Sequence, residues 1–530
     1  MKEELNMTKE EYAKMAFEEC CSEETAIPCG TKYGKPFWNV ESTQFMYVPA
    51  FHFNMIPGCK KYRYDAEDEK GMIHSFVAED CYSRLTPIWS EIPEGLVKLR
   101  VTALNDDGTE YGPAGARTFF RLASFPGDGP KKACSYKECA EKAYRFAMKQ
   151  DFIQSWLKNA VPDPYYDLNL YPSKMISSLI LAMLSFARIS PKDKSDAIKV
   201  AVNAADYLLS ITPRGDDPLA NLPPTYQFDF CPDPDTYGIK TPNWTNAMNH
   251  KGTLMMIYPA YVGIAYLELK EATGNRKYLD EALLIANYYK KTVLESGTWY
   301  LVRSVETGEP VSPNLISPMG KVVNFFLELY KKTDDEAWKV LADNAVGYVM
   351  KTQLPTYNWE GQFEDSVLSV NYSNLTHFSA DNLAMYLANN KADDPKSLEI
   401  AKELMRYSED QFVIWKRAYP WSYRSFYDTS LYHTPAGLEQ YNWYVPIDSS
   451  TAIILNGFLS LYKAGCGKLW LAKARTLADQ LTLMQEESGR ILTHWMNSPD
   501  CKEDYQFWYN CMFASCRILE AMSAYENVEL

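Results

Sequence analysis

Residues 335–353 read DEAWKVLADNAVGYVMKTQ, and this stretch decides the fold because the second half of the chain repeats its pattern. Its apolar residues recur at spacings of three and four with charged residues between them, which indicates a helix that buries one face. These apolar positions are Trp338, Leu341, Ala342, Ala345, Val346, Val349 and Met350. Pro355 follows closely and predicts the end of the helix.

Outward from this stretch, the same period predicts helices over most of the chain after residue 135. The other predicted ranges are 135–150, 172–189, 191–211, 253–273, 276–294, 316–333, 374–390, 395–415, 447–463, 467–485 and 505–524. Fold class follows from how these helices are connected.

The connections alternate between short and long. Only a few residues follow the helices that begin at 172, 253, 316, 374 and 447. Long connections occupy 157–171, 212–252, 295–315, 354–373, 416–446 and 486–504. Compact domains keep most connections short, and repeated long ones usually carry function.

Alternating connections predict an (α/α)6 toroid of six helical hairpins, in which all long loops surround one mouth of the ring. We expect the second helix of each pair to form the inner wall. A right-handed stack of helical repeats would also show hairpins, but it would not need enlarged loops on one side.

Residues 36–125 have a different period. Segments such as 44–53, 71–78, 95–108 and 117–123 are rich in β-branched and aromatic residues and are separated by turn signals, which predicts a small β-sandwich. The segment VKLRVTALNDDGTEYG (97–112) resembles the late strands of fibronectin type III domains. The predicted organisation is an N-terminal extension (1–35), the sandwich (36–125) and the toroid (135–530).

The composition argues against two classes of partner, nucleic acids and membranes. The net charge of −14 and the lack of a Lys/Arg cluster argue against a nucleic-acid partner. No stretch of about 18 apolar residues and no signal-peptide pattern is recognised, so we expect no membrane partner. Aromatic residues reach 14%, enough to line a ligand site as well as a core. The composition is compatible with a homo-oligomer.

The 12 cysteines show no CxxC pair and no repeated spacing, so we expect mostly free, buried thiols and no metal site. Free thiols favour a cytoplasmic location, although a chain with its signal peptide removed would look the same. Nucleotide and metalloprotease motifs (GxGxxG, GxxxxGK[ST], HExxH) and GxSxG are absent from the sequence, and no cofactor is expected.

The predicted mouth collects scarce residue types. All four histidines of the toroid lie in long loops or in a first helical turn, namely His250, His377, His433 and His494. The same loops contain Trp244, Trp299, Trp359, Trp421, Trp443 and Trp495. Aromatic platforms beside polar groups are typical of sugar sites, whereas a single loop tryptophan equally well fixes its loop in place.

Paired helices over 135–526 after a small β-domain resemble the (α/α)6-barrel carbohydrate-active enzymes, which include glycoside hydrolases, polysaccharide lyases and sugar epimerases. The loop WEGQFED (359–365) makes the chain most similar to glycoside hydrolase family 154, whose members cleave glucuronides. The resemblance implies a carbohydrate substrate and carboxylate chemistry.

Glycoside hydrolysis needs two carboxyl groups, one protonated and one ionised. In NWEGQFED (358–365), Glu364 and Asp365 are the candidates, with Glu364 preferred because Phe363 precedes it and would desolvate the carboxyl group. Glu439 is the reserve, and Asp229, Asp233 and Asp235 are weaker candidates. A solvated acidic turn is the alternative for the 358–365 carboxylates.

The candidate substrate-binding residues are His250, Tyr300, Arg303, Trp359, His377, Trp421, His433 and Tyr441. Arg303 is the candidate for holding a uronate, because a guanidinium pairs with a carboxylate through two hydrogen bonds. Arg417, Arg424 and Lys251 are its rivals. His377 and Asp381 are four residues apart, so Asp381 can fix the imidazole tautomer, unless the two form a buried polar pair.

The leading hypothesis is therefore a glycoside hydrolase that acts on small glycosides or oligosaccharides with a terminal uronic acid. A polysaccharide lyase would use the tyrosines and histidines to remove a proton beside the uronate. A non-catalytic carbohydrate-binding protein is the third hypothesis.

Overall fold

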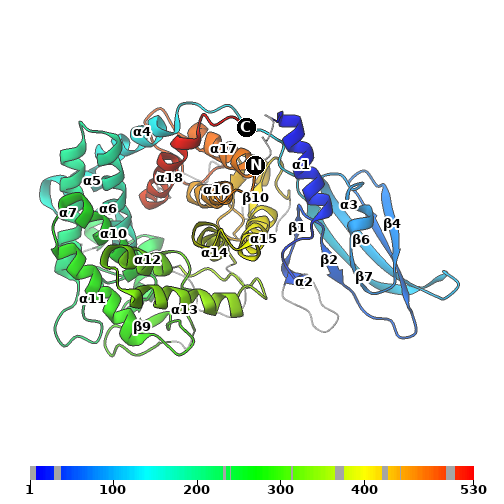
Figure 1. The fold of residues 1–530 in the computed structure, drawn as a ribbon, viewed down its shortest axis with the longest axis horizontal. Coiled ribbons are helices and arrows are strands. Elements are labelled where there is room, and N and C mark those ends of the chain that lie inside the picture. Colours follow the sequence, from blue (N-terminus) through cyan, green and yellow to red (C-terminus); the bar gives the residue numbers. More distant parts are fainter. Residues whose placement is uncertain are drawn as a thin grey trace.

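The structure is a computed structural model and describes residues 7–28, 38–230, 234–238, 240–311, 314–363, 375–420, 428–441, 443–496 and 508–530. Figure 1 shows a ring of helices on the left and a β-sheet region on the right, with helix α1 (Lys9–Ser22) beside the boundary. We call residues 38–125 the sheet region.

The sheet region contains a five-stranded sheet, in the order β1-β7-β6-β3-β4, and a two-stranded sheet, β2-β5, among the described residues. Its elements are α2 (Trp38–Glu41), β1 (Gln44–Phe45), β2 (Ala50–His52), β3 (Lys61–Glu67), β4 (Ile73–Ala78), β5 (Tyr82–Arg84), α3 (Thr86–Trp89), β6 (Gly95–Leu104) and β7 (Glu110–Arg121). Immunoglobulin-type sandwiches divide their strands four and three. The fibronectin-type likeness is therefore not confirmed.

Strand β3 lies inside the five-stranded sheet, yet the sequence analysis did not predict it. Tyr62, Tyr64 and Ala66 are buried and alternate with more exposed charged residues. This period of two is the signal of a half-buried strand. It was missed because charged residues occupy the intervening positions of KYRYDAE.

The inner wall of the ring is formed by six helices that follow one another around the circle. In the described part of the chain these are α6 (Pro172–Ile189), α10 (Tyr258–Thr273), α12 (Lys321–Thr333), α14 (Phe378–Asn390), α16 (Asp448–Lys463) and α18 (Tyr509–Met522). Between α12 and α14, Ser317 in the connection before α12 is joined to Ser379 in the first turn of α14 by a hydrogen bond 3.2 Å long. Helix α18 packs against α6 and closes the circle.

The outer helices each pack on an inner helix. They are α4 (Tyr136–Met148), α7 (Lys194–Ile211), α11 (Lys277–Thr292), α13 (Glu336–Thr352), α15 (Pro395–Phe412) and α17 (Lys468–Leu483). The expected inner wall is confirmed, because the second helix of each predicted pair, from α6 after α4 to α18 after α17, is the inner one. The ring closes between its two ends, where α4 packs on α18.

Shorter elements occupy the connections. They are α5 (Asp151–Asn159), η1 (Asp167–Leu170), α8 (Pro234–Tyr237), α9 (Pro242–Asn249), β8 (Thr253–Met255), β9 (Val302–Ser304), β10 (Val413–Ile414), η2 (Thr429–Leu431), β11 (Ala436–Gly437) and η4 (Ser523–Tyr525). Strand β8 occupies the residues predicted as the first turn of a helix at 253, so α10 begins only at Tyr258.

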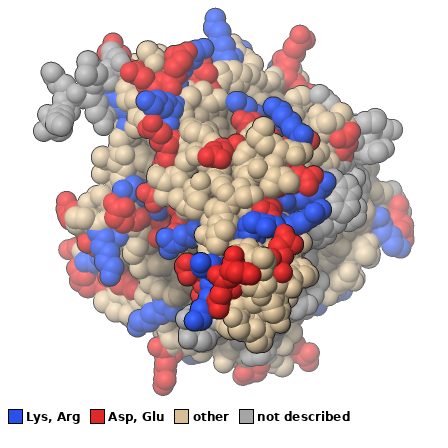
Figure 2. Space-filling model, turned by 90° about the vertical axis from the view of Figure 1, so that its right-hand side faces the viewer, with Lys and Arg blue, Asp and Glu red and all other residues tan. Residues whose placement is uncertain are grey.

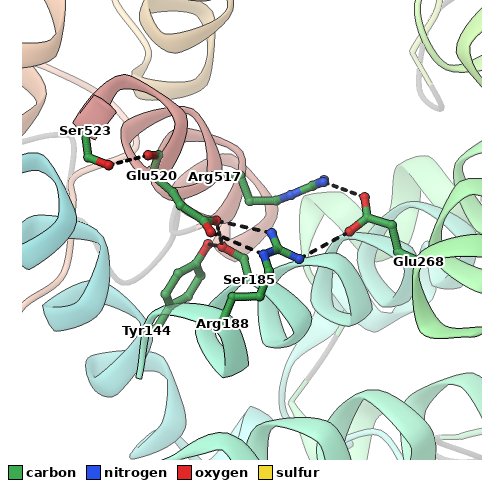
Figure 3. A network of polar contacts seen from close by, with 7 residues as sticks. All are labelled: Tyr144, Ser185, Arg188, Glu268, Arg517, Glu520 and Ser523. Carbon is green, nitrogen blue, oxygen red and sulfur yellow. Dashed lines mark hydrogen bonds and ion pairs between the residues drawn. The ribbon is translucent and has the colours of Figure 1, made fainter. Parts of the chain in front are cut away.

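The two ends of the inner helices differ. The long connections reach their N-terminal ends, which we call the mouth, and short turns follow their C-terminal ends, which we call the base. Figure 3 shows a polar network that joins α6, α10 and α18 toward the base. Arg517 donates to Glu268 at 2.7 Å, and Arg188 contacts both Glu268 and Glu520. This network, the base clasp, ties the last inner helix to the first two.

Buried polar groups join the sheet region to the ring. Asp410, at the end of α15, accepts hydrogen bonds from the backbone N–H groups of Met46 and Tyr47. The neighbouring Glu409 accepts from the hydroxyl of Tyr47 at 2.9 Å and pairs with Lys473 at 2.7 Å. Buried charges are tolerated when they are paired and hydrogen-bonded in this way.

Helix α6 is long and apolar enough to cross a membrane by length and composition, with a mean hydropathy of 1.2, which the sequence analysis had not recognised. Its position explains the composition, because 83% of the window is buried inside the protein. A helix that is apolar on all sides is expected for the inner wall of a ring.

On the face in Figure 2, acidic and basic side chains are interspersed among the coloured residues.

Candidate active site

A pocket of about 270 Å³ opens at the mouth of the ring. Lys174 lies in the first turn of α6, while Ile447 and Trp508 directly precede α16 and α18. The pocket is lined by Lys174, Phe363, Glu439, Gln440, Trp443, Ile447, Thr493, His494, Trp508 and Cys511. The lining combines two indole rings with a carboxylate, an ammonium and an imidazole. The volume of the pocket is close to the lower limit of about 300 Å³ for small-molecule sites.

One segment supplies four of these lining residues, and we call residues 437–447 the pocket loop. Its ends are close together, since the N–H of Ile447 donates to the carbonyl of Gly437 at 3.0 Å. Gly437 is required at this position because a Cβ would lie 2.9 Å from the Cα of Thr451 on α16. The loop is therefore seated directly on the N-terminal end of an inner helix.

Glu439 in the pocket has a second carboxyl group nearby, that of Asp448. Asp448 is fully buried at the start of α16 and accepts hydrogen bonds from the N–H of Ser449 and the hydroxyl of Ser515. Burial raises the pKa of Asp448 well above its usual range, and the negative charge of Glu439 raises it further. Burial and the charge of Glu439 therefore both favour the protonated form of Asp448.

His494 contributes a neutral imidazole. Burial lowers the pKa of His494 to about 4, so the ring carries no charge at neutral pH. Its ring meets the indole of Trp443 edge to face, with 5.4 Å between centroids. An uncharged imidazole can accept a proton or a hydrogen bond from a ligand.

Lysines at the mouth lie over aromatic rings. The ammonium of Lys174 is 4.4 Å from the ring centroid of Trp508, and that of Lys321, the first residue of α12, is 5.7 Å from Tyr261. Burial, with the charge of Arg517, lowers the pKa of Lys321 to about 8. Lys174 is therefore the cation that lines the pocket, and Lys321 adds a second cation at the same end of the ring.

Among the predicted catalytic residues, Glu439 lines the pocket. Glu364 and Asp365 lie outside the described residues, as do Trp421 and Asp233. Phe363 also lines the pocket, and Glu364 directly follows it in the chain. Burial raises the pKa of the third acid of this stretch, Glu360.

Two predicted ligand-binding aromatic residues are structural instead. The indole of Trp359 is fully buried and packs edge to face on Tyr357, so it offers no face to a sugar. The ring of Tyr441 is also buried, and its hydroxyl accepts a hydrogen bond from the N–H of Thr43 at 2.7 Å. Both expectations are corrected by burial, since a loop that crosses the mouth needs a small core of its own.

Arg303 is corrected in the same way. It lies on β9, is 8% exposed and donates to the carbonyl of Gly308 at 2.8 Å, so it fixes its own turn. Tyr300 bridges to Leu315 within the same connection. Neither residue lines the pocket described here. Among the rivals, Arg417 pairs with Glu69 of the sheet region, Lys251 lies over Phe228, and Arg424 is outside the described residues.

The histidines lie in the connections at the mouth, in different surroundings. His250 stacks on Tyr226, and the backbone N–H of His433 donates to the carbonyl of Trp495. The predicted pairing of His377 with Asp381 is present, with 2.5 Å between Nδ1 and Oδ2. Both of these side chains are fully buried, which corresponds to the alternative of a polar pair inside the ring.

The loop tryptophans divide into two groups. Trp299, Trp359 and Trp495 are fully buried and pin their loops, whereas Trp443 lines the pocket. Sequence reasoning missed Trp508 because it was counted as part of the predicted 505–524 helix. It also missed Lys174, Thr493 and Cys511. Lys174, Trp508 and Cys511 share a position at, or just before, the first turns of an inner helix, whereas Thr493 lies in the connection before α18.

Within the described ranges, no group of three or more His, Cys, Asp or Glu side chains is arranged to hold a metal ion. The described cysteines are free.

No protein-family model and no curated protein matches the sequence. The fold is similar to a family 76 glycoside hydrolase from a bovine Bacteroides thetaiotaomicron strain, at 10% identity over 89% of this chain and 95% of that chain, with a TM-score of 0.47. It is also similar to a sugar epimerase from a ruminal bacterium, at 12% identity over 74% of this chain and all (100%) of the other, with a TM-score of 0.49. Cellobiose 2-epimerase from Bacillus thermoamylovorans gives 13% identity over 73% and 99%, with a TM-score of 0.46. Such values identify no activity, and the ring rests on the helix contacts described above.

Proposed function

We propose that the protein is a carbohydrate-active enzyme, a glycoside hydrolase that binds a terminal sugar in the mouth pocket. The observation that carries the proposal is the lining itself, with Glu439 and His494 in one pocket with the indoles of Trp443 and Trp508. Indole faces suit the C–H face of a pyranose, and the polar groups suit its hydroxyls.

In this proposal Glu439 is one carboxyl group of the reacting pair. The second is Glu364 or Asp365, supported by their position directly after the pocket residue Phe363. Asp448 does not line the pocket, and its raised pKa disfavours a second negative charge beside Glu439. One ionised and one protonated carboxyl group are what glycoside hydrolysis requires.

A uronic acid is the proposed terminal sugar, with Lys174 in the role first given to Arg303. Lys174 lines the pocket, and an ammonium there attracts a carboxylate despite the net charge of −14. Replacement of Lys174 by Gln is expected to raise KM for an aryl glucuronide about tenfold and to leave KM for the matching glucoside nearly unchanged. Lys251→Gln, outside the pocket lining, is the matched control.

The test of the proposed class is turnover of a panel of aryl glycosides by the wild-type protein and by Glu439→Gln. We expect at least one glycoside to be cleaved, and its kcat to fall about 100-fold or more in the variant. Glu306→Gln, an exposed carboxylate of another mouth connection, should retain kcat. Saturable binding without turnover by the wild type would favour the non-catalytic carbohydrate-binding protein.

A lyase is the second candidate, favoured by the neutral imidazole of His494 in the same pocket as Lys174. His494 would remove the proton beside the uronate while Lys174 neutralises the carboxylate. Lyase cleavage leaves an unsaturated uronate with ultraviolet absorbance, whereas hydrolysis incorporates oxygen from water into the product. Cleavage in ¹⁸O-labelled water therefore separates the two reactions.

A further inference from the structure

We propose that the sheet region positions the pocket, because Thr43 and Gln44 hold the pocket loop from behind through Tyr441 and Tyr444. Thr43 and Gln44 are far from the ring in sequence and do not line the pocket. The activity readout of this inference rests on the proposed function, whereas its structural readout does not.

The pocket loop has two sides with different tasks. Glu439, Gln440 and Trp443 line the pocket. Leu438, Tyr441, Tyr444 and Val445 are buried, with at most 2% of each residue exposed. The orientation of the pocket side therefore depends on what holds the buried side.

Tyr441 is held by the sheet region. Its hydroxyl accepts the N–H of Thr43 at 2.7 Å and lies 3.3 Å from the Thr43 hydroxyl oxygen. Its ring meets the indole of Trp38 edge to face, with 5.4 Å between centroids. Thr43 is itself fixed, since its carbonyl accepts the N–H of Phe120 on β7. A chain of contacts thus runs from the five-stranded sheet to the residue two positions after Glu439.

Tyr444, next to Trp443, has an unusual backbone. Its φ angle is +56°, in the left-handed region that bulky residues rarely adopt. Such a conformation persists only when the surroundings enforce it, and it is concentrated at functional sites. At Tyr444 the surroundings include the Tyr432 hydroxyl, which donates to its carbonyl, and Gln44, whose side-chain oxygen accepts from its hydroxyl.

Gln44 is a rigid support. It is fully buried on β1, and its side-chain N–H donates to the carbonyl of Gln411 at the end of α15 at 2.9 Å. Gln411 returns a hydrogen bond to the carbonyl of Gln44 at 3.1 Å. The side-chain amide of Gln44 is therefore fixed by the ring, while its oxygen accepts the hydrogen bond from the Tyr444 hydroxyl. Loss of the tyrosine hydroxyls would free the pocket side of the loop without removing any lining residue.

The test uses the full-length variants Tyr441→Phe and Tyr444→Phe, separately, with Tyr47→Phe as the matched control. Tyr47 also spans the boundary through a buried hydroxyl, but this hydroxyl donates to Glu409 on α15. Hydrogen–deuterium exchange of the 437–447 peptide and the kinetics of the cleaved glycoside are measured for each folded variant.

We expect faster exchange of the 437–447 peptide in Tyr441→Phe and Tyr444→Phe than in the wild type and in Tyr47→Phe. We also expect kcat to fall about tenfold in these two variants, because a displaced carboxylate loses its alignment with the reacting bond, and to stay near normal in Tyr47→Phe. Equal exchange of this peptide in all three variants would overturn the positioning role. If the wild type cleaves no glycoside, the proposed function fails while the exchange result still decides this inference.

Discussion

The mouth and the base of the ring are built from opposite ends of the same inner helices, yet they treat charge differently. At the base, the charges of Arg188, Glu268, Arg517 and Glu520 are paired with one another across helices (Figure 3). At the mouth, Lys174 and His494 lie against the rings of Trp508 and Trp443, and burial displaces the pKa values of Asp448 and His494. Paired charges fix helices, whereas perturbed ones are typical of functional sites.

The comparison shows that the two ends of the inner helices have different roles. Their C-terminal ends are followed by short turns, and ion pairs join α6, α10 and α18 there. Their N-terminal ends receive long connections that bring distant residues together in the pocket. Substitutions at the mouth should therefore affect catalysis more than stability, and those at the base should do the opposite.

The largest expected effect is a contrast between variants of two glutamates, one of which loses activity while the other loses thermal stability. Glu439→Gln should lower kcat about 100-fold or more with little change in melting temperature. Glu268→Gln should keep kcat and lower the melting temperature, because it weakens its pairs with Arg188 and Arg517. Turnover assays and thermal unfolding of both variants check this, and loss of kcat in Glu268→Gln would erase the proposed division.

A smaller effect is expected from Trp508→Ala. The variant removes one indole wall of the pocket and the ring beside the ammonium of Lys174, so KM should rise about tenfold while the fold is retained. Trp244→Ala, which changes a partly buried indole on α9 outside the pocket lining, is the control. Similar KM values for the two variants would mean that the sugar does not stack in this pocket.

The base clasp should contribute a modest amount of stability. Arg517→Ala is expected to lower the free energy of unfolding by about 1 kcal/mol, since ion pairs that are partly open to solvent are screened. A double-mutant cycle with Glu268→Ala isolates the pair, with kcat as the second readout. A coupling energy of zero would show that packing alone closes the ring.

The smallest expected effect is a change in pH dependence at Asp448. Because its folded pKa is raised above the ordinary value of about 3.9, its contribution to stability is present below that value and declines as pH rises toward the folded pKa. Asp448→Asn should flatten this decline in unfolding free energies measured between about pH 4 and pH 8. Glu439→Gln should reduce it more weakly, because it removes only the secondary cause. An unchanged slope in Asp448→Asn would show that Asp448 is ionised.

Much of the helical ring could be predicted, because amphipathic outer helices carry a clear period. The inner role of the second helices could be predicted as well, and the apolar character of α6 on all sides agrees with it. The closing pair of α4 and α18 could not be predicted from local pattern, since it depends on contacts between the two ends of the ring. Strand β3 was hidden by its charged outward-facing residues.

The candidate site was predictable only in part. Glu439 was identified from an aromatic, acidic loop, and it lines the pocket. Trp359, Tyr441 and Arg303 share the residue types of a sugar site, but composition does not reveal whether a loop side chain faces a ligand or the loop's own core. Trp508 and Lys174 belong to no sequence motif. They line one pocket only because the N-terminal ends of different inner helices meet in the folded ring.

The pairing of α4 with α18 also bears on how the chain is made. Residues near 136 and near 522 must meet before the circle is complete, and α1 packs on α17 from the opposite end of the sequence. During synthesis from the N-terminus, α4 therefore has no partner helix α18 until residues near 522 have left the ribosome. Until then, the apolar face that α4 buries against α18 in the folded protein stays exposed to solvent. This late closure is therefore the folding step at which protection of apolar surface by a chaperone matters most.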